Sequence, residues 1–276
     1  MKRYSIRIPA KVNAVLKITG VDGRGYHLLE SAVIPLTDIY DEVSVVPRTD
    51  NDVRVEILNA PYIANNTAER AARTVIENFG TTGFDIEIKK GIPMSSGLGG
   101  SSADAAAVFR LIAEATGIVP ATDLMLRIGA DVPAMFHARP VMMRGIGGEL
   151  EFIDGLPPYK AVVLTGGGGK STAAVYAEYD RCGGADGNAS EAVGRLKAGE
   201  EGDYLFNALE KAAWSQAISE KKRLLIDAGF SLVTMSGSGD AVVGLTLENA
   251  EEKVSRLRII AGAEKYGVLL SNIKTN

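Results

Sequence analysis

Short stretches of alternating apolar and polar residues, rich in Val and Ile, dominate the first third of the chain. Such alternation predicts strands with one buried face. We expect strands at residues 5–8, 12–19, 28–36, 41–46, 53–58 and 85–89, with a helix at 68–78 before the last of them. A glycine/serine loop at 91–101 and a strongly apolar helix at 102–116 follow. A short helix and two strands, at 141–144 and 149–153, complete this part of the chain.

The second part of the chain has a different order of elements. Its pattern predicts strands at 160–165, 231–235, 241–245 and 268–270, and helices at 171–179, 191–198, 204–214, 219–228 and 249–260. Apart from the additional helices, the order is β-α-β-β-α-β, the split βαβ arrangement. Leu156, Pro157 and Pro158 form the best candidate linker. We therefore predict an α+β protein of two domains, residues 1–155 and 156–276, with a small-molecule site in the cleft between them.

Composition narrows the function classes. The net charge of the 276 residues is −4 and no Lys/Arg cluster is present, which argues against a nucleic-acid partner. No run approaches the roughly 18 consecutive apolar residues of a membrane helix. The single cysteine, Cys182, cannot form an internal disulfide, as is typical of a cytoplasmic protein. We expect a cytoplasmic monomer or homodimer that acts on a small molecule.

The segment PMSSGLGGSSADAAA carries the strongest chemical signal. Its glycines allow a tight turn close to a ligand, and its free N–H groups together with the following helix N-terminus can bind phosphate. We call residues 93–102 the first glycine loop; they are Pro93, Met94, Ser95, Ser96, Gly97, Leu98, Gly99, Gly100, Ser101 and Ser102. A flexible linker is the alternative, but the loop runs directly into an apolar helix. The pattern is neither a Rossmann fingerprint nor a Walker A motif.

Residues 165–172, TGGGGKST, form a second glycine loop between a predicted strand and a helix. The loop imitates a P-loop, but the first glycine of a Walker A motif would fall at Leu164, so the spacing fails. A glycine-rich turn capped by Ser171 or Thr172 explains the run equally well. A role in holding a phosphate of the substrate stays open.

Several motifs of the chain resemble those of the GHMP kinases and occur in the same order along the sequence. The first glycine loop resembles the phosphate-binding motif of that family, and Met235-Ser236-Gly237-Ser238-Gly239 resembles its third motif. The runs PAKVN at 9–13 and GADVP at 129–133 resemble a branch of the family that phosphorylates a cytidine-containing alcohol in isoprenoid precursor synthesis. The resemblance implies an N-terminal ribosomal-protein-S5-like domain, a C-terminal ferredoxin-like domain, and ATP with Mg²⁺ as cofactors.

The resemblance also implies roles for individual residues. Asp131 would be the general base and Lys11 would stabilise charge. Ser102 is the candidate Mg²⁺ ligand by analogy with other members. Asn66 and Lys90 match nucleotide-binding positions loosely, and a helix N-cap explains Asn65 or Asn66 equally well.

For the cytidine end, the run VDGRGYH makes His27 the best reader of the cytosine. Tyr176 could stack on the base. The remaining predicted substrate contacts are Asn13, Tyr26, Gly237 and Ser238.

Two positions depart from the resembled branch. Val33 stands where an aromatic residue often stacks on the base, and Asp240 brings a negative charge close to the expected phosphates unless it points away or meets a cation. These departures leave two alternatives open. One is another GHMP kinase, acting on homoserine or a mevalonate-type alcohol. The other is a catalytically inactive, nucleotide-binding regulator.

Overall fold

The computed structural model describes residues 1–61, 63–260 and 262–276, and within these ranges the strands form one sheet of six and one of four. The six-stranded sheet has the order β3-β4-β2-β5-β6, with β1 paired to β2. Its strands are β1 (Tyr4–Val21), β2 (His27–Pro47), β3 (Val53–Ile57), β4 (Phe84–Lys89), β5 (Val141–Gly145) and β6 (Glu149–Phe152).

The long hairpin of β1 and β2 differs from the sequence prediction. We predicted four strands, at 5–8, 12–19, 28–36 and 41–46, but the structure has two continuous ones. The pairing shifts at Pro9/Ala10, at Asn13/Val15 and at Ile18/Gly20, so β-bulges interrupt the alternation without ending the strands. A bulge looks like a strand end in the sequence because it breaks the two-residue period.

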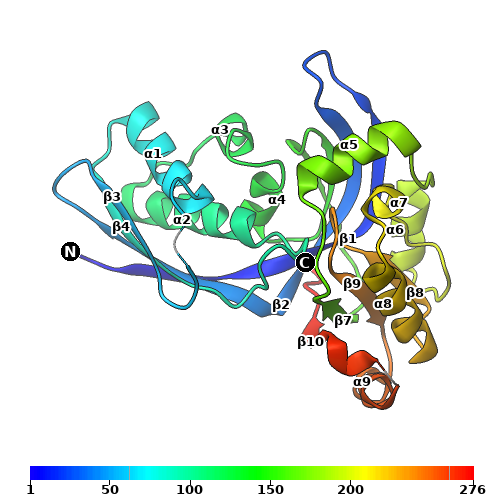
Figure 1. Ribbon diagram of the computed structural model, residues 1–276. Helices are drawn as coiled ribbons and strands as arrows, with labels where there is room; N and C mark the ends of the chain where they lie inside the picture. Colours follow the sequence, from blue (N-terminus) through cyan, green and yellow to red (C-terminus); the bar gives the residue numbers. More distant parts are fainter. Residues whose placement is uncertain (62, 261) are drawn as a thin grey trace.

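Helices cover one face of this sheet (Figure 1). They are α1 (Thr67–Phe79), α2 (Gly100–Thr116), α3 (Thr122–Leu126) and α4 (Val132–His137). The central helix α2 packs against α1, α4, β1 and β2, which explains why it is apolar nearly all round. This packing fixes the N-terminus of α2, where the first glycine loop ends.

The second sheet has the order β10-β7-β9-β8 and is antiparallel throughout. Its strands are β7 (Lys160–Thr165), β8 (Leu232–Met235), β9 (Val242–Thr246) and β10 (Gly267–Asn272). The helices are α5 (Thr172–Cys182), α6 (Ala189–Lys197), α7 (Glu210–Ala213), α8 (Gln216–Asp227), α9 (Ala250–Ile259) and the 3₁₀ helix η1 (Ala263–Lys265). The order of elements confirms the predicted split βαβ arrangement and the α+β class.

The predicted helix at 204–214 is wrong for its first half, since α7 covers only Glu210–Ala213. The segment before it pairs with β1 instead: Leu16 N donates to Phe206 O at 2.9 Å, and Ala208 N donates to Leu16 O at 2.8 Å. Backbone groups bonded to a strand are not available for a helix. The apolar spacing of this segment therefore reflects burial without helical structure.

The end of the chain returns to the first sheet, close to where β7 begins (Figure 1). Lys274 N donates to Pro35 O at 2.9 Å, and Ile273 pairs with Leu36. The two sheets are thus connected by backbone pairing as well as by the segment 153–159, and the domain limit at 155–156 stays a prediction. No helix in the described part of the chain has the length and apolarity needed to span a membrane.

Candidate active site

The first glycine loop connects β4 to α2 through backbone conformations that favour glycine. Gly97 and Gly99 have φ angles of 81° and 78°. A Cβ atom on Gly97 would lie 2.3 Å from Ser236 O, and one on Gly99 would lie 2.9 Å from Lys11 Cγ. Glycine is therefore required at both positions for the loop to fit against its neighbours. Ser95 also has a positive φ, 56°, a conformation that costs energy for a residue with a side chain.

Hydrogen bonds bring the first glycine loop, residues 235–241 and β1 together. Lys11 N donates to Leu98 O at 3.0 Å, which ties the loop to β1. Ala241 N donates to Ser96 O at 2.8 Å, and Ser236 Oγ donates to Gly97 O at 3.0 Å. These two bonds tie the first glycine loop to residues 235–241, the third glycine loop. The first and third glycine loops thus form one continuous wall.

This wall bounds a cavity of about 780 Å³. All of the first glycine loop lines it, together with Lys11, Asn13, Asp131, Lys170, Ser171, Thr172, Gly237, Ser238 and Gly239. Two groups of apolar residues extend the lining. One group lies on β3, β4 and the segment before α1 and comprises Ile57, Ala60, Pro61, Ile63 and Ile88. The other comprises Leu16, Leu29, Met143, Tyr176 and Leu209. The sequence reasoning missed both groups, apart from Tyr176, because isolated apolar residues resemble core positions.

Lys11 and Asp131 form an ion pair in this cavity. The Lys11 Nζ atom lies 3.1 Å from Asp131 Oδ2 and donates to Asn13 Oδ1 at 2.6 Å. The Lys11 side chain is 3% exposed, whereas that of Asp131 is 26% exposed. Asp131 stands at the N-terminus of α4, and Asn13 Nδ2 donates to Ser31 Oγ, which holds Asn13 in place. The arrangement presents a carboxylate to the cavity and keeps an ammonium group directly behind it.

Lys90 also borders the cavity, but two carboxylates already bind its ammonium group. Asp104 Oδ2 accepts from Lys90 Nζ at 2.7 Å, and Asp41 Oδ2 accepts from the same atom. Asp41 Oδ1 accepts from Gly91 N at 2.7 Å and from Ile92 N at 2.8 Å. The chain segment that enters the first glycine loop is therefore connected to α2, which leaves it.

Asp104 has one carboxylate oxygen, Oδ1, that is buried without a hydrogen-bond partner. Burial raises the pKa of Asp104 to about 7, and the neighbouring Asp41 adds to the rise while Lys90 opposes it. Asp104 lies in the run SSADAAA that follows the glycines of the first glycine loop. Its pairing with Lys90 could not be predicted, because the two residues belong to different elements.

Asn66 is the N-cap of α1, as one of the two sequence interpretations proposed. Its Oδ1 atom accepts from Glu69 N at 3.0 Å, and its Nδ2 donates to Ile63 O at 3.0 Å. Asn66 also lines the cavity, so its predicted contact with the nucleotide stays a prediction.

The predicted cytosine-reading residues lie near β2 and α5. His27 Nε2 lies 2.7 Å from Asp180 Oδ1, and the His27 ring is 4.7 Å from that of Tyr176, which lines the cavity. Tyr26 is 60% exposed and lies in the turn between β1 and β2, outside the cavity lining. Val33 is buried in the core and is not among the residues that line the cavity. This position therefore offers no stacking surface to a base in the cavity.

The negative charge of Asp240 is balanced by a cation, as the sequence requires if the residue does not point away from the phosphates. Its Oδ1 atom accepts from Lys221 Nζ at 2.6 Å, and its Oδ2 accepts from Gly166 N at 2.7 Å.

Asn207 was not found by sequence reasoning because it belongs to no motif. Its Nδ2 donates to Met235 O and Gly237 O, both at 2.8 Å, and so supports the third glycine loop.

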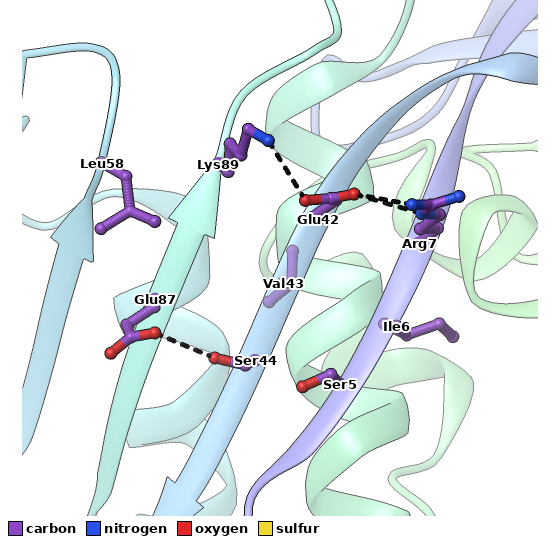
Figure 2. A pocket seen from close by; sticks show the side chains of 9 residues that line it. All are labelled: Ser5, Ile6, Arg7, Glu42, Val43, Ser44, Leu58, Glu87 and Lys89. Carbon is purple, nitrogen blue, oxygen red and sulfur yellow. Dashed lines mark hydrogen bonds and ion pairs between the residues drawn. The ribbon is translucent and has the colours of Figure 1, made fainter.

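A second hollow, of about 350 Å³, lies on the outer face of the six-stranded sheet (Figure 2). Its charged groups are all paired: Glu42 pairs with Arg7 at 3.1 Å and with Lys89 at 3.6 Å, and Glu87 pairs with Arg3. It lacks the glycine-lined wall of the large cavity, and its paired charges offer no counterpart of Asp131.

Comparison with known proteins agrees with this geometry. Residues 66–139 match the model of the GHMP kinases N terminal domain. The 4-diphosphocytidyl-2-C-methyl-D-erythritol kinase of Deinococcus radiodurans is 35% identical, with 96% of this chain and 92% of the relative covered. That of Syntrophotalea carbinolica is also 35% identical, with 87% of this chain and 89% of the relative covered.

Solved structures give the same result. A crystal structure of 4-(cytidine 5'-diphospho)-2C-methyl-D-erythritol kinase superposes with a TM-score of 0.82 at 30% identity, covering 99% of this chain and 100% of the other. Homoserine kinase from Cytophaga hutchinsonii shares the fold, with a TM-score of 0.65 at 18% identity, covering 100% and 97% of the two chains.

The fold and the matched N-terminal domain define a small-molecule kinase of the GHMP class. Within that class, the chain belongs to the family of 4-diphosphocytidyl-2-C-methyl-D-erythritol kinases. The family predicted from the sequence motifs is confirmed.

Proposed function

We propose that the chain transfers the γ-phosphate of ATP to the 2-hydroxyl of 4-diphosphocytidyl-2-C-methyl-D-erythritol, as a cytoplasmic monomer or homodimer in isoprenoid precursor synthesis. The observation that carries the proposal is the Lys11–Asp131 pair in a cavity that the first glycine loop also lines. The similarity to named relatives over nearly the whole chain supports the choice of alcohol.

ATP binds with its phosphates on the first glycine loop. The backbone N–H groups of the loop and the N-terminal end of α2 attract anionic oxygens, and Ser95, Ser101 and Ser102 add hydroxyl donors. The apolar group that includes Ile57, Ile63 and Ile88 suits the adenine ring.

In the transfer step, Asp131 accepts the proton of the substrate hydroxyl. The hydroxyl oxygen forms a bond to the γ-phosphorus, the bond between that phosphorus and the bridging oxygen breaks, and ADP leaves. Lys11 neutralises negative charge that develops between Asp131 and the phosphate. The role of the protein is mainly to hold the reacting atoms in line and to balance their charge.

The lining also suits a Mg²⁺ ion carried by the nucleotide. Mg²⁺ in kinase sites takes phosphate oxygens, waters and one or two protein oxygens. The described residues contain no cluster of three or more acidic, His or Cys side chains that could hold a metal, while the Ser102 hydroxyl lies on the cavity wall. Ser102 would contact the ion, which neutralises charge on the β- and γ-phosphates when bound.

The cytidine end of the substrate binds between β2 and α5. Tyr176 stacks on the cytosine ring, and His27 forms hydrogen bonds to its polar edge, with Asp180 holding the imidazole. Asn13, Gly237 and Ser238 contact the methylerythritol diphosphate portion. Tyr26, on the neighbouring turn, contributes at the edge of this site.

ADP release with a panel of alcohols tests the proposal. The purified protein, ATP and Mg²⁺ are combined with the cytidylyl alcohol, its uridylyl analogue, homoserine or mevalonate. We expect the cytidylyl alcohol to give the highest kcat/KM. Faster turnover of homoserine or mevalonate would overturn the choice of substrate, and ATP binding without turnover of any alcohol would overturn the assignment as an active kinase.

A further inference from the structure

A buried lysine–aspartate pair joins the second and third glycine loops. Lys221, on α8, is fully buried, and the Asp240 side chain is 9% exposed. Lys221 Nζ donates to Asp240 Oδ1 at 2.6 Å, to Gly166 O at 2.9 Å and to Asp240 O. Asp240 Oδ2 in turn accepts from Gly166 N at 2.7 Å.

Every polar side-chain atom of the pair forms at least one hydrogen bond in this connection. The three donors of the ammonium group have three acceptors, and each carboxylate oxygen has a donor. Burial lowers the pKa of Lys221, and the hydrogen bond and charge of Asp240 oppose that change. A buried ion pair is rarely the most stable choice, because apolar residues of similar volume often stabilise a protein as well or better. A role in fixing one arrangement of the loops explains the pair better than stability does.

The second glycine loop needs such a support. Gly166, Gly167 and Gly168 have φ angles of 96°, 95° and 76°, which glycine adopts freely. Fixing a glycine in one conformation costs more backbone entropy than fixing any other residue. A Cβ atom on Gly167 would lie 2.8 Å from Ala217 Cβ, so the loop passes close to α8. Within the described part of the chain, the hydrogen bonds of Gly166 to Asp240 and Lys221 are the ones that hold the residues 166–169.

The supported loop leads directly into the cavity. Lys170, Ser171 and Thr172 line it, and the Thr172 hydroxyl lies 2.8 Å from that of Ser238 in the third glycine loop. Ser171 caps α5 by accepting from Ala174 N, and α5 carries Tyr176 to the cavity wall. The position of Gly166 therefore helps to set where α5 starts and where Tyr176 lies, together with the bond from Lys170 Nζ to Ala212 O at 2.8 Å.

We propose that Lys221 and Asp240 are positioning residues that hold the second glycine loop and α5 in place for the alcohol substrate. The inference rests on the proposed function for the identity of that alcohol. ATP binds mainly to the first glycine loop, which has its own connections to Lys11 and Ser236. Loss of the pair should therefore weaken binding of the alcohol more than binding of ATP.

Three variants test this role: Asp240→Asn, Lys221→Met, and Lys221→Met combined with Asp240→Ser. We expect each to raise KM for the alcohol about tenfold, as for the loss of a hydrogen bond to a charged group, with KM for ATP within about twofold of wild type. The two single variants also leave a charge buried without its partner, so they should unfold more easily. The double variant removes both charges and should regain stability while KM for the alcohol stays raised.

Lys222→Met is the matched control. Lys222 is the next residue of α8, but its side chain is 31% exposed and pairs with Glu210 at the surface. All kinetics are measured well below the unfolding temperature of each variant. Hydrogen exchange of the peptide that covers residues 165–176 should be faster in the three variants than in wild type and in Lys222→Met, with no substrate present.

Two results would overturn the inference. One is unchanged exchange in residues 165–176 in the double variant. The other is an equal rise in KM for ATP and for the alcohol. Exchange does not depend on which alcohol the enzyme uses, so a wild-type protein that fails with the cytidylyl alcohol would contradict the proposed function without deciding the role of the pair.

Discussion

Two lysine–aspartate pairs in the described part of the chain differ in their access to the cavity: Lys11 and Asp131 line it, whereas Lys221 and Asp240 do not. Lys11 and Asp131 are 3.1 Å apart, and Lys221 and Asp240 are 2.6 Å apart. Both lysine side chains are almost completely buried. The aspartates differ: the side chain of Asp131 is 26% exposed, whereas that of Asp240 is 9% exposed.

This difference is the reason why we propose a reactive role for Lys11 and Asp131 and a positioning role for Lys221 and Asp240. Each carboxylate oxygen of Asp240 accepts a hydrogen bond from a backbone N–H or an ammonium group, and Asp240 is not among the residues that line the cavity. Among the described residues, the ion pair with Lys11 is the one polar contact of the Asp131 carboxylate, which leaves lone pairs free toward the cavity. Residue types alone do not show which aspartate can act as a base. The hydrogen-bond partners of each carboxylate and its access to the cavity make the distinction.

The substitution Asp131→Asn should give the largest effect. Removal of a general base typically lowers kcat by about 10²–10⁴-fold. Because the amide keeps the shape of the carboxylate, KM for both substrates should change little. Steady-state ADP release with the cytidylyl alcohol measures both parameters.

Asp240→Asn is the matched comparison, since it makes the same chemical change in the other pair. Its kcat should stay within about tenfold of wild type, as expected for a residue that acts on position rather than on proton transfer. A loss of kcat in Asp240→Asn as large as that in Asp131→Asn would contradict the distinction between the two pairs.

Lys90→Met comes next, and it tests whether Lys90, whose side chain is 11% exposed, positions the first glycine loop or binds the nucleotide directly. The change leaves Asp41 and Asp104 without their cation, and breaking a buried pair in this way typically costs about 3–5 kcal/mol of stability. KM for ATP should also rise, because the segment that enters the first glycine loop loses its bond to Asp104 on α2. Chemical denaturation and steady-state kinetics measure the two effects.

The double variant Lys90→Met with Asp104→Asn sharpens the result. If Lys90 positions the loop, removal of one unpaired carboxylate should restore part of the stability and part of the affinity for ATP. If Lys90 binds the nucleotide directly, as the family resemblance implies, stability should improve while KM for ATP stays raised.

The sequence predicts this fold well where periodicity and glycine motifs are dense. The first glycine loop, the split βαβ order and the pairing partners Lys11 and Asp131 are all present in local runs that can be recognised without a structure. The cavity lining could not be predicted in this way. Ile57, Leu209 and Met143 come from distant elements, and only the tertiary arrangement shows that they face a ligand rather than the core.

The buried networks of polar side chains could not be predicted from the sequence either. The sequence predicts that Asp240 must point away from the phosphates or meet a cation. It does not identify Lys221 as that cation, because a lysine on a helix is expected at the surface. The segment before α7 was predicted as a helix because its apolar spacing suits one, whereas Asn207 and its neighbours pair with β1. In both cases long-range hydrogen bonds override the local pattern.

The smallest predicted effect concerns pH and comes from Asp104. Burial raises its pKa in the folded protein to about 7, well above the value of about 4 for an unfolded aspartate. Between these values the folded protein binds more protons than the unfolded chain, so the free energy of unfolding must fall as pH rises. A single group changes it by at most about 1.4 kcal/mol per pH unit. Asp104→Asn removes the group and keeps its neutral shape.

The measurement is the free energy of unfolding of wild type and of Asp104→Asn from pH 5 to pH 8. Relative to the variant, wild type should lose stability as pH rises toward 7 and should level off above that value, where the Asp104 carboxylate is charged. A constant difference across this range would show that Lys90 keeps Asp104 charged throughout. Lys90 would then balance both carboxylates on its own, and the first glycine loop would be held by the same charges at every pH in this range.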